Sequence, residues 1–211
     1  MTAPRRALIV IDVQNEYFDA DRPLAVAYPP RDESLKRVLT AMDAARDAGV
    51  PVVTVAHVWP AGSPVFAEGA EETRLHPDVA ARSDAVAAHV VKQGSSVFTA
   101  DGMPEWLRDN AIDTLTLVGY MTNNCVLASA AGAEPEGLAV EVLSDATGAI
   151  HLANAAGSAS AQQVHETLMV LLHSNWAAVA DTDAWIDAVA AGRPLEKSDL
   201  GSSAVQGRAE H

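Results

Sequence analysis

Three side chains whose types could carry out nucleophilic chemistry are Asp12, Lys92 and Cys125. A thiol can attack an electrophilic carbon, a carboxylate can take up the thiol proton, and an ammonium group can stabilise the resulting negative charge. Each residue alone also has an ordinary explanation, as a turn former, a lysine that reaches the surface, or a small buried residue. Their positions favour chemistry, because all three lie in or directly after predicted strands.

Cys125 is the only cysteine of the 211 residues, and it follows the apolar, β-branched run TLTLVGY. We expect a helix to begin here, with Thr122 or Asn123 as its cap. Unpaired N–H groups and the helix dipole should then lower the pKa of the thiol. A single cysteine can form neither an internal disulfide nor a cysteine-based zinc site.

The elements that must position these residues alternate between strand and helix. Predicted strands cover residues 7–13, 50–58, 89–93, 114–120, 139–145 and 176–181. Predicted helices cover 34–48 (with Asp32 as cap and Gly49 as stop), 104–110, 125–135, 159–175 and 183–191. This order predicts an α/β fold with three layers, α/β/α, and a Rossmann-like, doubly wound, mostly parallel six-stranded sheet. The carboxyl ends of parallel strands meet at one edge, where ligands bind.

The predicted domain organisation is a single domain over residues 1–191, followed by a mobile C-terminal tail over 192–211, where the pattern is lost. The net charge of −14 argues against nucleic acid or an anionic membrane as partners. No apolar run approaches the roughly 20 residues of a membrane span. No secretory signal precedes the first strand, so a cytoplasmic location is expected. The sequence lacks G-x-G-x-x-G, P-loop and G-x-S-x-G motifs.

Three segments taken in order resemble one known group of enzymes. They are DVQNEYF, a lysine in an apolar strand before GSSVF, and GYMTNNCV. Together they resemble the isochorismatase-like cysteine hydrolases, which include nicotinamidases, N-carbamoylsarcosine amidases and biuret hydrolases. The resemblance covers roughly residues 7–181. It implies a catalytic triad of Asp12, Lys92 and Cys125 and an oxyanion hole formed by the N–H groups of Met121 and Cys125. It also implies a cis peptide between Tyr120 and Met121.

Further residues near these motifs are candidates for substrate binding. They are Gln14, Tyr17, Phe18, His57, Trp59, Tyr120 and His151. Nicotinamidases carry an Asp-x-His metal pair after the second strand, whereas TVAHVWP has His57 without that aspartate. We therefore expect no metal and no other cofactor, although His57 and His76 could form a partial site. His165 and His173, eight residues apart on one helix, are expected to be structural.

The presence of Cys125 favours cleavage of a C–N bond, because the isochorismatases that hydrolyse a vinyl ether typically lack this nucleophile. The expected substrate is a small amide, carbamoyl, ureide or lactam compound, and the sequence does not choose among these. Two alternatives stay open: an isochorismatase-type vinyl-ether hydrolase, and a thiol sensor or binding domain without hydrolysis. The resemblance further implies a homo-oligomer, either a dimer or a tetramer.

Overall fold

The computed structural model describes residues 3–211, and its centre is a six-stranded sheet in the order β3-β2-β1-β4-β5-β8. All five strand pairings in this sheet are parallel. The strands are β1 (Arg6–Ile11), β2 (Val52–His57), β3 (Val86–Lys92), β4 (Thr114–Tyr120), β5 (Ala139–Gly148) and β8 (Ala178–Ala180). The predicted doubly wound α/β fold is therefore confirmed, and every strand of the main sheet is parallel.

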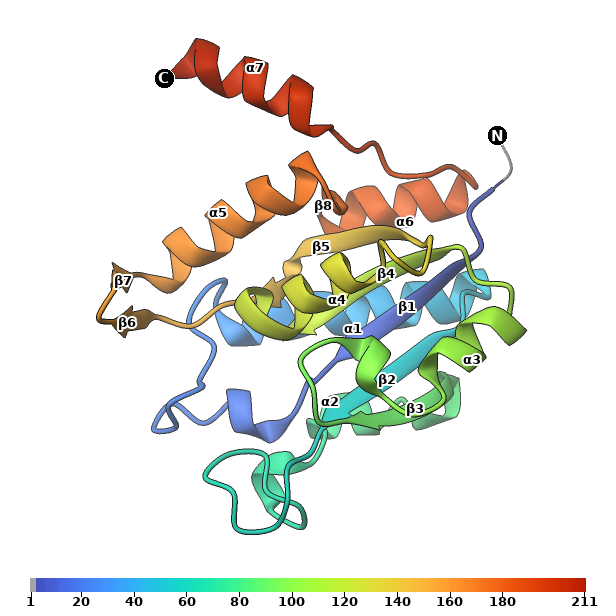
Figure 1. Cartoon of the computed structure of the whole chain (residues 1–211). Helices are drawn as coiled ribbons and strands as arrows, with labels where there is room; N and C mark the ends of the chain where they lie inside the picture. Colours follow the sequence, from blue (N-terminus) through green and yellow to red (C-terminus); the bar gives the residue numbers. More distant parts are fainter. Residues whose placement is uncertain (1–2) are drawn as a thin grey trace.

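Helices cover both faces of the sheet (Figure 1). The helices are α1 (Arg31–Ala48), α2 (Pro77–Ala80), α3 (Met103–Asp109), α4 (Leu127–Gly132), α5 (Ala161–Ser174), α6 (Thr182–Ala190) and α7 (Leu200–Glu210). Short 3₁₀ turns are η1 (Asn15–Tyr17), η2 (Glu71–Thr73), η3 (Ser83–Ala85) and η4 (Val97–Thr99). Side chains of α3, α4 and α5 pack on one face, and those of α1, α2 and α6 pack on the other.

Strand β1 shows why its sequence is apolar throughout. Ala7, Ile9 and Ile11 enter one core, and Leu8 and Val10 enter the other. All five are fully buried, as expected for a central strand with helices on both faces.

The backbones of β1 and β4 approach each other closely near the carboxyl edge. Gly119 has φ +102°, and a Cβ atom at this position would lie 2.1 Å from the carbonyl oxygen of Ile11. Only glycine fits such an approach without strain. Gly119 thereby brings the residues that follow β1 and β4 into contact range.

The structure differs from the sequence-based expectation at several local features. Helix α1 begins at Arg31 with Pro30 as its N-cap, so Asp32 lies in the first turn instead of capping it. Gly49 ends the helix with φ 71°, as predicted. A small antiparallel hairpin, β6 (Leu152–Asn154) and β7 (Gly157–Ala159), and the helix α7 near the C-terminus were not predicted. Within residues 3–211, no helix is both long and apolar enough to cross a membrane.

Candidate active site

The three reactive side chains lie at the carboxyl ends of three strands of the sheet. Asp12 directly follows β1, Lys92 is the last residue of β3, and Cys125 lies in η5 (Thr122–Val126), the π-helical turn after β4. Asp12 has φ 50°, a left-handed conformation that is uncommon for a residue with a side chain and that clusters at functional sites.

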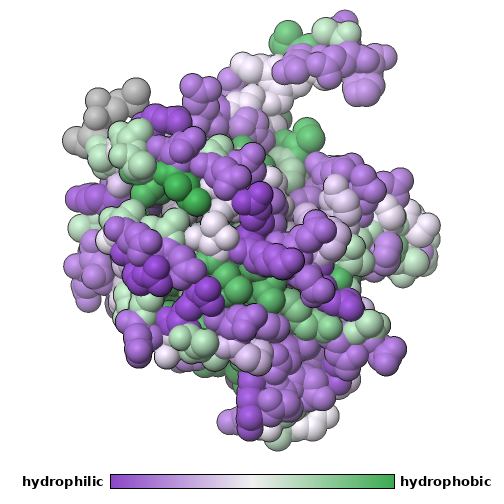
Figure 2. Space-filling model, turned by 180° about the vertical axis from the view of Figure 1, so that it is seen from behind, coloured by the Kyte–Doolittle hydropathy of each residue, from purple (hydrophilic) through white to green (hydrophobic). Residues whose placement is uncertain are grey.

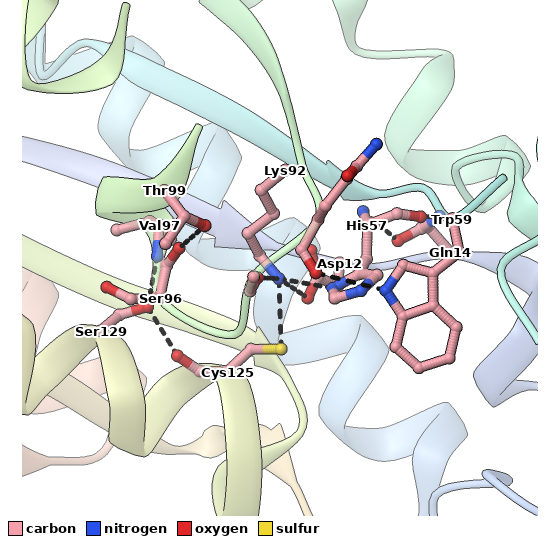
Figure 3. Close-up of polar contacts among 12 residues, drawn as sticks. Asp12, Gln14, His57, Trp59, Lys92, Ser96, Val97, Thr99, Cys125 and Ser129 are labelled. Atoms are coloured by element: carbon pink, nitrogen blue, oxygen red, sulfur yellow. Dashed lines mark hydrogen bonds and ion pairs between the residues drawn. The ribbon is translucent and has the colours of Figure 1, made fainter. Parts of the chain in front are cut away.

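The ammonium group of Lys92 is the centre of the cluster (Figure 3). Its Nζ lies 2.8 Å from Oδ2 of Asp12 and 3.2 Å from Sγ of Cys125. Nζ also lies 2.9 Å from Nδ1 of His57, and it donates to the carbonyl of Gly94 at 3.2 Å. The structure thus brings the three predicted catalytic residues together.

Burial sets the protonation of this cluster. Asp12 is fully buried, and Lys92 and Cys125 are each 1% exposed. Burial, together with the charge of Asp12, raises the pKa of the Cys125 thiol to about 12, although Lys92 opposes the shift. Burial likewise raises the pKa of Asp12, against the lowering effect of Lys92. The expectation of a lowered thiol pKa was wrong, because desolvation outweighs the local stabilisation of a thiolate.

The turn that carries Cys125 begins differently from the prediction. Its N-cap is Met121, without a side-chain cap, and Thr122 instead shares a 3.0 Å hydrogen bond with Nδ1 of His165. The peptide between Tyr120 and Met121 is cis, as the resemblance implied. His173 also bonds within the chain, because its Nδ1 accepts from the N–H of Val179 at 3.0 Å.

Gln14 fixes the backbone next to the cluster. Its Oε1 accepts from the N–H of His57 at 2.8 Å, and its Nε2 donates to the carbonyl of His57 at 2.9 Å and to the carbonyl of Thr73. The side-chain amide is therefore engaged with backbone groups, which makes Gln14 a positioning residue for His57. Asn15 holds the neighbouring loop by donating to the carbonyl of Glu71 at 3.1 Å.

His57 has one nitrogen committed and one without a partner. Nδ1 accepts from Lys92, and Nε2 is buried with no hydrogen-bond partner among the described residues. Burial, with a smaller effect from the charge of Lys92, lowers the pKa of His57 to about 4. At neutral pH the ring is therefore neutral, and because Nδ1 accepts, Nε2 carries the hydrogen.

This shift predicts how stability depends on pH. Between about pH 6.5 and pH 4 the unfolded chain binds a proton at His57 that the folded protein excludes, so stability falls as the pH falls. A His57→Asn variant retains an acceptor near Lys92 but does not titrate. We expect the loss of unfolding free energy between pH 7 and pH 4.5 to be about 2 kcal/mol smaller in the variant. Urea unfolding at both pH values measures this difference, and equal losses in the two proteins would contradict it.

Sequence reasoning missed Ser129, which joins the segment that follows β3 and Lys92 to the turn that carries Cys125. Its Oγ donates to the carbonyl of Cys125 at 2.6 Å and accepts from the N–H of Val97 at 3.0 Å (Figure 3). The sequence offered only one indication of this role: the serine follows the cysteine by four residues, which is about one helical turn. Nothing local indicated that it would meet the loop after β3.

The aromatic candidates form a layer beside the cluster. Tyr17 lies between Phe66 and Tyr120, with ring centroids 5.4 Å and 5.5 Å away. Phe18 packs against His76 at 4.5 Å and Tyr120 at 5.7 Å. Burial and the nearby charges of Asp12 and Cys125, among other groups, raise the pKa of Tyr17.

Two of the predicted substrate residues, Tyr120 and His151, make hydrogen bonds away from the cluster around Lys92. The hydroxyl of Tyr120 bonds to Oγ of Ser34 at 2.8 Å, so it points into the core beside α1. His151 lies outside the cluster, in a separate cleft of about 510 Å³ whose lining includes Arg31 and Ile150. Its Nδ1 accepts from the N–H of Ala161 at 3.1 Å. Trp59, by contrast, is 37% exposed and lies 5.3 Å from the ring of His57.

The donor atoms of Asp12, His57 and Cys125 lie within 4.8 Å of one another, a spacing that could hold a metal ion. The ammonium group of Lys92 already contacts all three donors at 2.8–3.2 Å. A metal ion at this position would have to displace the ammonium group of Lys92. The three donor atoms are therefore arranged around the lysine. His76 instead caps α2, where its Nδ1 accepts from the N–H of Asp78 at 3.3 Å.

Comparison with known proteins identifies the family. Residues 6–184 match the Isochorismatase domain. The chain is 28% identical over 141 residues to the secreted isochorismatase effector Isc1 of Verticillium dahliae, covering 67% of this chain and 71% of that protein. It is 25% identical over 189 residues to Nicotinamidase 3 of Arabidopsis thaliana, covering 84% and 85%. The cytoplasmic location of this chain stays a prediction.

Solved structures agree with this assignment. An isochorismatase homologue from Burkholderia xenovorans LB400 is 49% identical and superposes with a TM-score of 0.94 over 99% of both chains. A cysteine hydrolase from Pseudomonas syringae pv. phaseolicola, 22% identical, shares the fold with a TM-score of 0.80 over 89% of this chain and 93% of its own. The chain therefore belongs to the isochorismatase family of hydrolases, and its Asp12, Lys92 and Cys125 are arranged as a candidate cysteine-hydrolase triad.

Proposed function

We propose that this protein is a cysteine-dependent hydrolase that cleaves a C–N bond of a small amide, carbamoyl, ureide or lactam compound. The observation that carries the proposal is the single ammonium group of Lys92, which contacts both the carboxylate of Asp12 and the thiol of Cys125 in a buried cluster. Such a cluster supplies a proton acceptor, a cation and a nucleophile within reach of one reacting carbon.

The raised pKa values of Cys125 and Asp12 suit a thiol that loses its proton only while it attacks the substrate. Cys125 starts as a thiol, and its proton passes to Asp12 as Sγ bonds to the substrate carbonyl carbon. Lys92 stabilises the sulfur while it carries negative charge, and the N–H groups of Met121 and Cys125 bind the oxyanion of the tetrahedral intermediate.

The second half of the reaction returns the proton. Asp12 donates it to the leaving nitrogen, the C–N bond breaks, and a thioester to Cys125 remains. Asp12 then takes a proton from water while the water oxygen attacks the thioester carbon. Collapse of this intermediate releases the acid and transfers the proton back to sulfur. Overall, one water is consumed, and the products are an acid and an amine or ammonia, or a single amino acid when the substrate is a lactam.

We further propose that His57 and Trp59 bind the substrate. The neutral ring of His57, fixed by Lys92 and Gln14, presents Nε2–H as a buried donor without a partner among the residues described, and a buried donor of this kind binds an acceptor atom strongly. Trp59, half-exposed beside that ring, offers a flat surface for a planar amide or ureide.

The test is product release from a panel of small amides, ureides and lactams, measured as ammonia or amine for the amides and ureides and as the ring-opened amino acid for the lactams, with Cys125→Ala as the blank. Release by the wild type alone, together with a thioester adduct at Cys125 detected by mass spectrometry, is the expected result. Hydrolysis of a vinyl ether without nitrogen release would contradict C–N cleavage. A protein that binds panel members equally well with and without Cys125, and releases nothing, would be a binding domain or thiol sensor.

A further inference from the structure

Helix α7, at the C-terminal end, lies apart from the body of the protein (Figure 1). All eleven residues of the helix, Leu200–Glu210, are exposed or partly exposed. The helix is short, and it contains Gly201 and Gly207, which weaken an isolated helix. A helix of this length is marginal in water unless a face of it packs against another surface. Its own chain supplies little of such a surface, and Figure 2 shows the segment standing clear of the body from the opposite side.

The segment before α7 is fixed to the body at several points. The carbonyl of Arg193 accepts from Nη2 of Arg6 at 2.7 Å, and the N–H of Leu195 donates to Oε1 of Glu141 at 3.4 Å. Nζ of Lys197 donates to the carbonyl of Asn175. The helix therefore projects from a segment that is hydrogen-bonded to the body of the protein, next to the C-terminal end of α5. The superposition with the Burkholderia homologue covers 99% of the chain and so includes this projecting helix.

Most of the exposed large apolar side chains lie on α5, α7 and the hairpin that precedes α5. Among the described residues, the exposed large apolar side chains are Trp59, Val91, Leu152, Val170, Leu171, Leu200 and Val205. Four of these seven lie on α5 and α7, and a fifth, Leu152, lies on the hairpin that precedes α5. Val170 and Val205 are the most exposed, at 71% and 72%. A concentration of this kind marks an interaction surface.

Charge on the two helices is sparse and complementary. Apart from histidines, Glu166 is the one charged residue of α5, in a chain that is 20% charged with a net charge of −14. Helix α7 carries two charged residues, Arg208 and Glu210, and Arg208, three residues after Val205, forms no ion pair within residues 3–211. Glu166 precedes Val170 by four residues, so Val170 with Glu166 on α5 and Val205 with Arg208 on α7 each place an apolar side chain and a charge, of opposite sign, on neighbouring turns.

We propose that α7 of one protomer docks on α5 and the β6–β7 hairpin of a second copy of this chain, and that the exchange is reciprocal. A two-fold axis makes both contacts at once, because the projecting helix and the apolar face belong to the same chain. The proposed contacts place Val205 against Val170 and Arg208 beside Glu166. A second copy of the chain suits this surface. Two copies of so acidic a chain repel each other over most of their surface, whereas this face carries little charge.

The test is analytical ultracentrifugation of the full-length chain and its surface variants. We expect a wild-type mass of twice the 22.1 kDa of one chain. Val205→Asp and Val170→Asp, on the two sides of the proposed contact, should each weaken the dimer by about tenfold or more. Val91→Asp is the matched control, because Val91 is 48% exposed on β3, the opposite edge strand of the sheet, and it should leave the dimer intact.

A charge exchange tests the pairing of the helices. Arg208→Glu and Glu166→Arg should each weaken the dimer, and the variant with both changes should recover it, since the ion pair is restored with reversed signs. A monomeric wild type, or an oligomer that withstands both Val205→Asp and Val170→Asp, would overturn the proposal. An unchanged circular dichroism spectrum verifies that each variant is folded. These readouts are independent of catalysis and therefore of the proposed hydrolase function.

Discussion

Replacement of Cys125 by alanine is expected to lower kcat/KM by about 10⁴-fold or more, because the removal of a nucleophile abolishes the covalent route. The thiol is the atom that bonds to substrate, and no second cysteine exists to replace it. Steady-state kinetics on the best substrate of the panel measures the effect. Calorimetric titration should show that the variant still binds substrate with an affinity within a few-fold of the wild-type KM.

Cys125→Ser is the stricter control, because a hydroxyl keeps the polarity and nearly the size of the thiol. A hydroxyl is a far weaker nucleophile under the same base, so we expect a loss close to that of alanine. Wild-type-like activity in either variant would show that Cys125 does not attack the substrate. The protein would then belong with the family members that cleave without a cysteine nucleophile.

The second large effect is expected on stability, from the buried pair of Asp12 and Lys92. Asp12→Asn and Lys92→Met keep the shapes of the side chains, and each leaves the other buried group without its partner at 2.8 Å. Loss of one member of a buried ion pair costs about 3–5 kcal/mol. Each single variant should lose about this much unfolding free energy, and the double variant should lose less than the sum of the two. Urea unfolding at pH 7 measures all four proteins.

The pH dependence of Lys92→Met provides a further check on the same pair. Without Lys92, burial still raises the pKa of Asp12 and only the hydrogen bond with Cys125 opposes it, so the folded protein retains a proton that the unfolded chain releases. The stability of this variant, relative to wild type, should therefore fall as the pH rises from about 4 to 7. Additive losses in the double variant, with no such pH trend, would show that the pair is not energetically coupled.

The alternation of strands and helices along the chain and the identity of the reactive residues were predictable from the sequence. Runs such as ALIVIDV and TLTLVGY are apolar throughout because central parallel strands are buried on both faces, and this pattern is local. Since such strands end at a common edge, Asp12, Lys92 and Cys125 could be expected to meet, and the structure confirms that they do. The resemblance of three ordered motifs to one family strengthened the same prediction.

Other features depended on which groups meet across the fold. The amide of Gln14 is taken up by backbone groups of two different loops, and the hydroxyl of Tyr120 bonds to Ser34 from a distant helix. The root of α7 is held by residues of β1 and β5, which no local pattern near residue 200 reveals. The predicted mobility of residues 192–211 stays a prediction.

The sequence by itself thus determined the α/β fold, the edge at which chemistry can occur and the three side chains able to perform it. The tertiary structure alone decided the protonation of these groups and the partner of His57. The reason is physical: periodicity and residue type are local properties, whereas desolvation and charge coupling depend on every atom packed around a group. Burial raised the pKa of Cys125 where its position in the turn predicted the opposite, and Lys92 joined His57 to the triad that the motifs predicted.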